Sequence, residues 1–284
     1  MPDITTGLVL HYDFEDGATD ISGNGNDGTI PANVEETYIC SNNKACLFNG
    51  DNNDHPDGAV SVPTSVDFDS NYRSYSIWSR FDEGTRIPSA SSNASCILSR
   101  HDTNQSLNGY QIYGSPQVTD EISLGCYFKS SGVDATLYKV VPGKYDVHHV
   151  VILMDTLLDK ASLIIDNVVY EDMESVNIVW GNQDLKIGQS PDTNGLPSYW
   201  KKWLGAIGEI RIYNRLLSLQ DIDLLYTDFC NIYLINQMKI VNGSLAFASD
   251  NSLNNGLFAH RLDHIVKSNS DFIELVDDTS SLNL

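Results

Sequence analysis

Short segments in which apolar and polar residues alternate run through most of this chain, with turn-forming residues between them. A period of two is typical of strands in an antiparallel sheet, because successive side chains point to opposite faces. The clearest segments are 7–14, 74–81, 149–154, 162–165, 168–170, 185–188 and 208–213. Many short strands of this kind predict an all-β sandwich of two antiparallel sheets.

The alternation also predicts which side chains share a face: Leu8, Leu10, Tyr12 and Phe14 in the first segment, and Tyr75, Ile77 and Phe81 in the second. Segment 149–154 is a continuous apolar run, which suits a central strand. Asp166 and Asn167 stand between two β-branched runs and tolerate positive φ, so they predict a tight hairpin.

One short helix is predicted at 218–226. Ser218 suits the N-cap position, and Asp221 stands three residues later, where its carboxylate can reach back to the cap. Helical spacing places Ile222, Leu225 and Tyr226 on one face. We expect this helix to close an edge of the sandwich.

The character of the sequence changes near residue 228. We therefore predict a β-sandwich domain over 1–228 and a mixed C-terminal extension over 229–284. Within the extension, 232–241 suits a strand pair and 258–266 a short amphipathic helix, whereas 277–284 is polar. We expect the extension to dock on the sandwich or on a partner.

Composition narrows the classes of partner. Hydrophobic residues make up 41% of the chain, which is enough for a packed core. The net charge of −21 repels phosphate backbones and anionic lipids, so we expect neither nucleic-acid binding nor membrane insertion. The sequence shows no apolar run of the roughly 18 residues that a membrane helix needs, and no signal-like start. Either the chain is mature, or it works where no signal is needed, in the cytosol or on a particle assembled there; a virion surface is one such setting.

The five cysteines are Cys40, Cys46, Cys96, Cys126 and Cys230. An odd count without a Cys-x-x-Cys motif favours buried reduced thiols over a disulfide framework. A Cys40–Cys46 bridge is the alternative.

Four ordered segments resemble the laminin-G-like/concanavalin A-like lectin-glucanase superfamily. They are GLVLHYDFED at 7–16 with DISGNGNDGT at 20–29; SYSIWSR at 74–80; DVHHVV at 146–151 with LIIDNV at 163–168; and LKIG at 185–188 with LGAIGEIRIYNRLLS at 204–218. The resemblance implies a jelly-roll sandwich that binds glycans, proteins or surfaces, often with structural Ca²⁺. This chain has Val147 where the superfamily usually has Trp, and Gly208 where it usually has Asp. The second difference removes a carboxylate that is common at that position of the superfamily.

The loop at 20–28 is rich in Asp, Asn and Gly, and such a loop can supply the oxygen ligands that calcium prefers. The candidate ligands are Asp20, Asn24, Asp27 and, from the next acidic loop, Asp51. The alternative is a tight connector held by Asx turns.

Tyr199, Trp200 and Trp203 form the candidate ligand-binding cluster, because aromatic faces stack on sugar rings. The alternative is that Trp200 and Trp203 pack on the sandwich edge. Trp78 and Trp180 are expected in the core. His148 and His149 are adjacent in a strand and therefore point to opposite faces, so they are expected to be structural.

Catalysis is not expected. A glycosidase needs two suitably spaced carboxylates, and segment 171–174 comes closest without the flanking pattern. The sequence therefore predicts a non-enzymatic binding or adhesion module for a carbohydrate or another surface. The alternatives are a structural or attachment protein of a virus or phage, in which 229–284 contacts other virion subunits or itself, and a glycoside hydrolase.

Overall fold

The structure is a computed structural model that describes residues 3–40, 43–49, 58–63, 68, 70–82, 95–101, 108–130, 133–174, 178–189, 201–241 and 244–247. The chain divides into two units, Met1–Tyr226 and Thr227–Leu284, and each is described by itself. Within the described residues, no helix is both long and apolar enough to span a membrane.

The first unit contains an eight-stranded sheet, here called sheet A. Its strands lie in the order β12 (Val168–Glu174), β11 (Lys160–Ile165), β10 (Val147–Asp155), β5 (Tyr72–Phe81), β15 (Leu204–Tyr213), β3 (Asn43–Asn49) and β2 (Glu35–Cys40), and β1 (Leu8–Tyr12) also pairs with β15. Each pairing in sheet A is antiparallel. The continuous apolar run 149–154 lies in β10, a central strand, as predicted.

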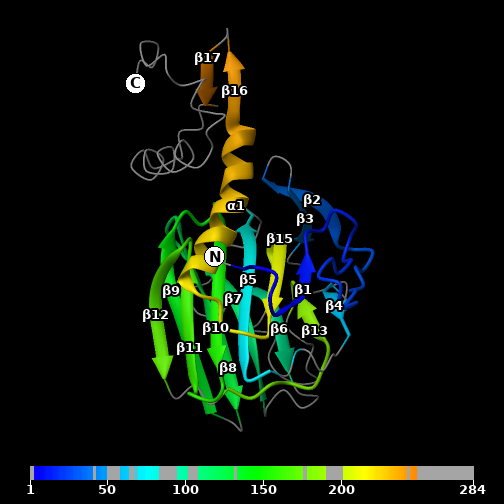
Figure 1. Cartoon of the computed structure of the whole chain (residues 1–284), viewed down its shortest axis with the longest axis vertical. Helices are drawn as coiled ribbons and strands as arrows, with labels where there is room; N and C mark the ends of the chain where they lie inside the picture. The colour runs from blue at the N-terminus through cyan, green and yellow to red at the C-terminus, as the bar shows by residue number, and fades with distance from the viewer. Residues whose placement is uncertain are drawn as a thin grey trace. The chain divides into compact units, whose positions relative to one another are not determined.

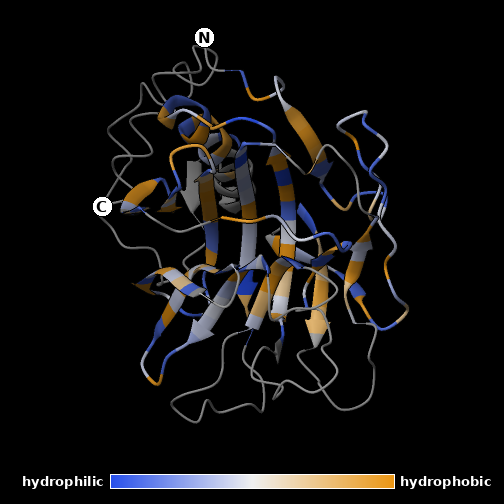
Figure 2. Cartoon of the chain, turned by 90° about the horizontal axis from the view of Figure 1, so that it is seen from below, coloured by the Kyte–Doolittle hydropathy of each residue, from blue (hydrophilic) through white to orange (hydrophobic). Residues whose placement is uncertain are grey.

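A seven-stranded sheet, sheet B, faces sheet A (Figures 1 and 2). Its strands lie in the order β4 (Val60–Val62), β13 (Leu185–Ile187), β6 (Ser95–His101), β7 (Asn108–Pro116), β8 (Glu121–Ser130) and β9 (Val133–Pro142). The two-residue strand β14 (Lys201–Lys202) pairs with β6 in parallel, whereas the other pairings are antiparallel. The predicted all-β sandwich is confirmed.

The main core lies between the two sheets. Sheet A contributes the inward phase of β5, which holds Tyr75, Ile77 and Phe81 as the alternation predicts. Sheet B contributes the inward phase of β8, made of Ile122, Leu124, Cys126 and Phe128. Figure 2 shows the two layers from below, with strands that carry both hydrophobic and hydrophilic residues. Because of this alternation, one phase of each strand is buried between the sheets and the other phase points to the outer face of its sheet.

The prediction for β1 was wrong at Leu8. Leu10, Tyr12 and Phe14 belong to the main core, but Leu8 packs on the outer face of sheet A beside Val151 and Ile164. The cause is an irregularity in the pairing with β15 between Leu8 and Leu10, which reverses the phase of the strand.

The predicted hairpin is confirmed at Asp166 and Asn167. Both residues have positive φ, 51° and 63°, and Ile165 pairs with Val168 directly across the turn. Positive φ at both central positions gives a turn whose twist matches that of the paired strands. The Asn167 amide also donates to Asp223 Oδ1 at 2.7 Å, which ties the turn to the nearby helix.

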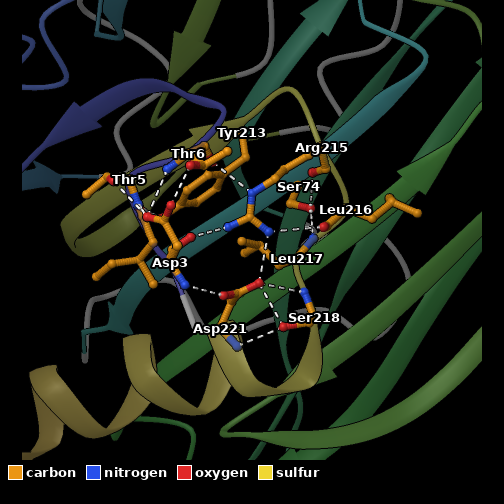
Figure 3. A network of polar contacts seen from close by, with 11 residues as sticks. Asp3, Thr5, Thr6, Ser74, Tyr213, Arg215, Leu216, Leu217, Ser218 and Asp221 are labelled. Carbon is orange, nitrogen blue, oxygen red and sulfur yellow. Dashed lines mark hydrogen bonds and ion pairs between the residues drawn. The ribbon is translucent and has the colours of Figure 1, made fainter. Parts of the chain in front are cut away.

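The helix α1 (Leu219–Gln237) begins where the sequence predicts. Ser218 Oγ accepts from the amide of Asp221 at 3.1 Å, and Asp221 Oδ2 accepts from the amide of Ser218 at 2.9 Å (Figure 3). This reciprocal capping box satisfies amides that have no partner within the helix. The first turns cover the outer face of sheet A, where Ile222 and Leu225 pack in a second apolar cluster.

The same helix start holds the N-terminal segment. Asp221 Oδ1 accepts from the amide of Asp3 at 3.1 Å, and its Oδ2 accepts from Arg215 at 2.8 Å. Arg215 also donates to the carbonyl of Thr6 at 2.7 Å (Figure 3). Residues more than 200 positions apart are thereby joined at one corner of the first unit.

In the second unit, the predicted strand pair at 232–241 is only partly correct. Residues 232–237 continue α1, and β16 (Met238–Val241) pairs with β17 (Ser244–Phe247). The predicted helix at 258–266 and the polar end at 277–284 lie outside the described residues.

The cysteines and tryptophans that the structure describes are mostly buried. Cys46, Cys96 and Cys126 are buried free thiols, so Cys46 forms no bridge to Cys40. Trp78 is buried as predicted, but it lies on the outer face of sheet A, where it stacks on His149 with ring centroids 4.5 Å apart. Trp180 is half-buried and packs edge-on against Tyr110 of the main core.

Candidate functional site

The loop predicted to bind calcium is closed by its own hydrogen bonds. Asp20 is buried, and its carboxylate accepts from the amides of His11 and Ser22, each at 3.0 Å, and of Asn26 at 2.9 Å. Asp27 Oδ1 accepts from the amide of Asp20 at 2.8 Å. These bonds form Asx turns and attach the loop to β1.

Asn24 acts as a donor in the same loop. Its side-chain nitrogen donates to the carbonyls of Leu8 and Val9 at 2.8 and 3.2 Å. Among the described residues, no three His, Cys, Asp or Glu side chains form a group that could hold a metal ion. Asp51 lies outside those residues, and calcium binding stays a prediction.

Of the predicted aromatic cluster, the structure describes Trp203 alone. Tyr199 and Trp200 lie outside the described residues. Trp203 is fully buried in the main core, where its ring packs edge-on against Phe81 with centroids 5.7 Å apart. Its Nε1 donates to the carbonyl of Ala206 at 3.3 Å. The prediction that Trp203 stacks on a ligand is therefore wrong, because its indole offers no exposed face.

A different aromatic surface lies on the outer phase of β8 and β9. We call it the β8–β9 platform and define it by its six residues: Tyr127, Lys129, Asp134, Thr136, Tyr138 and Val140. They alternate along each strand with inward residues such as Cys126, Phe128 and Leu137. Because β9 is the edge strand of sheet B, the platform lies at the rim of the sandwich.

Tyr138 is the exposed aromatic residue of the platform. Tyr138 is 50% exposed. Val140, on the same phase, is 40% exposed. An exposed ring beside an apolar side chain can stack on the apolar face of a sugar.

The neighbouring row of the platform is polar and mutually bonded. Lys129 pairs with Asp134 across the strands, and Lys129 Nζ lies 3.8 Å from Asp134 Oδ1. The hydroxyl of Tyr127 donates to the Asp134 carboxylate. Burial, together with this carboxylate, raises the pKa of Tyr127 well above its usual value, so the hydroxyl stays protonated and remains a donor.

A buried tyrosine supports the platform from β7. Gly125 of β8 pairs with Tyr113 on one side and with Tyr138 on the other. Tyr113 is only 6% exposed and its hydroxyl bonds to Ser123; burial is the main reason that its pKa is raised. Tyr113 therefore supports the sheet surface and offers little area to a ligand.

The sequence carried a signal for this platform that the predictions did not use. In β8, Ile122, Leu124, Cys126 and Phe128 occupy one phase, while Ser123, Gly125, Tyr127 and Lys129 occupy the other. An aromatic residue on the polar phase of a strand does not follow the pattern of the core residues, which occupy the other phase. Tyr127 and Tyr138 could have been recognised in this way once β8 and β9 had been predicted as strands.

The outer face of sheet A holds a second polar group. Glu209 Oε1 lies 2.7 Å from His11 Nε2 and 2.6 Å from Arg211 Nε. Burial raises the pKa of Glu209, but the bond from His11 and the charge of Arg211 outweigh it and hold the pKa below its usual value. A general acid needs the opposite shift, so this group supports a structural ion pair more than acid catalysis.

Comparison with known proteins gives the family and the fold. The sequence matches the family described as the Concanavalin A-like lectin/glucanases superfamily over residues 52–223. No curated protein matches the chain.

Solved structures with the same fold include three at low sequence identity. Domain 4 of AbnA, an extracellular GH43 arabinanase from Geobacillus stearothermophilus solved with arabinotriose, has a TM-score of 0.50 and 21% identity, with 77% of this chain and 98% of that chain covered. The serotype G botulinum neurotoxin binding domain has a TM-score of 0.57 and 17% identity, with coverage of 83% and 54%.

The binding domain of botulinum neurotoxin DC, solved in complex with SialylT, has a TM-score of 0.53 and 11% identity, with coverage of 80% and 52%. The chain thus spans about half the length of these neurotoxin domains. The family match extends over more than half of the chain, and the two-sheet sandwich agrees with it. This chain belongs to the concanavalin A-like lectin/glucanase superfamily.

Proposed function

We propose that the chain is a non-catalytic glycan-binding module and that the β8–β9 platform forms part of its ligand site. The observation that carries the proposal is the half-exposed Tyr138, which lies on the same outer face of the β8–β9 pair as the hydrogen-bonded Tyr127 and Asp134. Carbohydrate sites combine an aromatic surface for the sugar ring with fixed polar groups for the hydroxyls.

The relatives support the same class of ligand. The arabinanase domain was solved with arabinotriose, and one neurotoxin binding domain was solved with SialylT. The fold alone does not choose a ligand, since one fold hosts many functions. The platform supplies the local chemistry on which the proposal depends.

A binding experiment with a matched control tests the proposal. The whole chain is applied to a glycan array, and the best ligand is then titrated calorimetrically into wild type, Tyr138→Ala and Tyr38→Ala. Tyr38 is 55% exposed on β2 of the other sheet, so it matches Tyr138 in residue type and exposure. We expect Tyr138→Ala to weaken binding at least about fivefold, as for an anchoring aromatic residue, and Tyr38→Ala to leave it unchanged.

An array without any bound glycan, or equal effects of the two variants, would contradict the proposal. The predicted role in a virus or phage particle, and self-association through 229–284, stay predictions, since no observation on the described residues favours them.

A further inference from the structure

The charges around the β8–β9 platform bear on which sugars it accepts. The whole chain carries a net charge of −21, so an anionic ligand approaches against a repulsive field. An acidic sugar overcomes such a field only where an unengaged Arg or Lys can pair with its carboxylate or sulfate.

The lysines near the platform are already engaged. Lys129 lies beside Asp134, and Lys139 Nζ lies 5.6 Å from the centre of the Tyr170 ring on β12. Lys144, in the turn after β9, donates to the carbonyls of Gln117 and Thr119 at 3.2 and 3.0 Å. Each of these three described cations has a partner, and one partner is the platform's own carboxylate.

Asp134 has the capacity to read sugar hydroxyls. Its side chain is 55% exposed, while Lys129 and the Tyr127 hydroxyl approach it from the sheet. A carboxylate offers about four lone-pair positions, so those two partners leave positions on the exposed side. Sugar hydroxyls are donors of the kind that such an acceptor binds, whereas a carboxylate on an acidic sugar would be repelled.

Resting on the proposed function, we infer that the platform takes a neutral sugar and that Asp134 is its specificity-determining residue. Tyr138 supplies the stacking surface for one sugar unit, and Asp134, four residues away on the same face of β9, accepts from hydroxyls of a neighbouring unit, while Lys129 with the Tyr127 hydroxyl holds that carboxylate in place. The same negative charge excludes sialylated, uronic and sulfated glycans.

Paired neutral and acidic probes test this inference. Lactose is compared with 3′-sialyllactose, and arabinotriose with trigalacturonic acid, by calorimetric titration into the whole chain at low salt. We expect the neutral member of a bound pair to bind at least tenfold more tightly. Equal or tighter binding of the acidic member would overturn the inference and leave the proposed function standing. Binding of no glycan, in these pairs or on the array, would overturn both.

Substitutions of the exposed Asp134 distinguish a role in sugar specificity from a role in folding. Asp134→Ala is expected to weaken binding of the neutral sugar about tenfold, as for lost hydrogen bonds to a charged acceptor. Asp134→Lys is expected to reverse the preference between neutral and acidic members, which a purely structural role would not do. Asp172→Ala removes an exposed carboxylate from β12 and serves as the control, with no change expected. An unchanged preference in Asp134→Lys would refute the assignment of Asp134.

Discussion

His148 and His149 are neighbours in β10, yet their environments shift their pKa values in opposite directions. His148 Nδ1 lies 2.8 Å from Asp166 Oδ2, and its Nε2 lies 2.8 Å from the carbonyl oxygen of Gly143. His149 lies on the other face, where its ring stacks against both Trp78 and Tyr226. The sequence predicted opposite faces, and the structure confirms it. Asp166 contacts both residues, since its Oδ1 accepts from the amide of His149.

The first prediction concerns acid. Burial lowers the pKa of His149 to about 4, below the usual value of about 6.5. Its contribution to stability is therefore fully present above pH 6.5 and is lost as the pH falls through 4, on the order of 3 kcal/mol in all. In chemical denaturation between pH 7 and 4, His149→Phe should lose less stability than wild type. If both proteins lose the same unfolding free energy between pH 7 and 4, the lowered pKa of His149 does not contribute to the loss of stability in acid.

The second prediction concerns His148 and has the opposite sign. Burial opposes its charge, but Asp166 and the Gly143 carbonyl outweigh burial and raise the pKa above its usual value. Both ring nitrogens face acceptors, so both carry protons in this geometry. The stabilisation is complete below pH 6.5 and is lost as the pH rises through the raised pKa. Relative to wild type, His148→Leu should be most destabilised near pH 5.5 and less so near pH 9.

The third prediction concerns the helix cap. Ser218→Ala should cost about 1 kcal/mol of unfolding free energy, as for a lost N-cap. Asp221→Ala should cost more, because its carboxylate also accepts from Arg215 and from the amide of Asp3. Gln220→Ala, at an exposed position of the same turn, is the control. If denaturation shows that Ser218→Ala lowers the unfolding free energy more than Asp221→Ala does, the hydrogen bonds of Asp221 shown in Figure 3 do not have the expected importance.

The fourth prediction separates Trp203 from ligand binding. Trp203→Ala should lower stability by about 3–5 kcal/mol, because it opens a cavity in the core. Trp203→Phe should lose less and should keep glycan affinity within about twofold, since the indole is fully buried. Melting curves and titrations with the array's best ligand check both statements. If Trp203→Phe folds normally but loses glycan binding, Trp203 contacts the ligand and this prediction is wrong.

The fifth prediction concerns the loop at 20–28. Asp20→Ala leaves the amides of His11, Ser22 and Asn26 without their carboxylate, so a loss of about 2–4 kcal/mol is expected whether or not an ion is present. Melting of wild type in excess chelator then checks the calcium prediction separately. A lower melting temperature would support a bound ion, because an ion held only by the folded state stabilises it.

The sequence by itself determined features that depend on close neighbours along the chain. Alternation fixed the faces of β5, paired turn-formers fixed the hairpin at Asp166 and Asn167, and Ser218 with Asp221 fixed the helix start. These signals are local because a strand, a tight turn or a cap is built from residues two to four positions apart.

Only the tertiary structure decided which features serve a ligand. Trp203 stands in an aromatic, lysine-rich segment that suits a surface, yet the sheets enclose it. Tyr127 reaches Asp134 and the face of Tyr138 only because β8 and β9 pair in one register at the rim of sheet B. The order of strands in a sheet is set by contacts between distant segments, and no local pattern records that order.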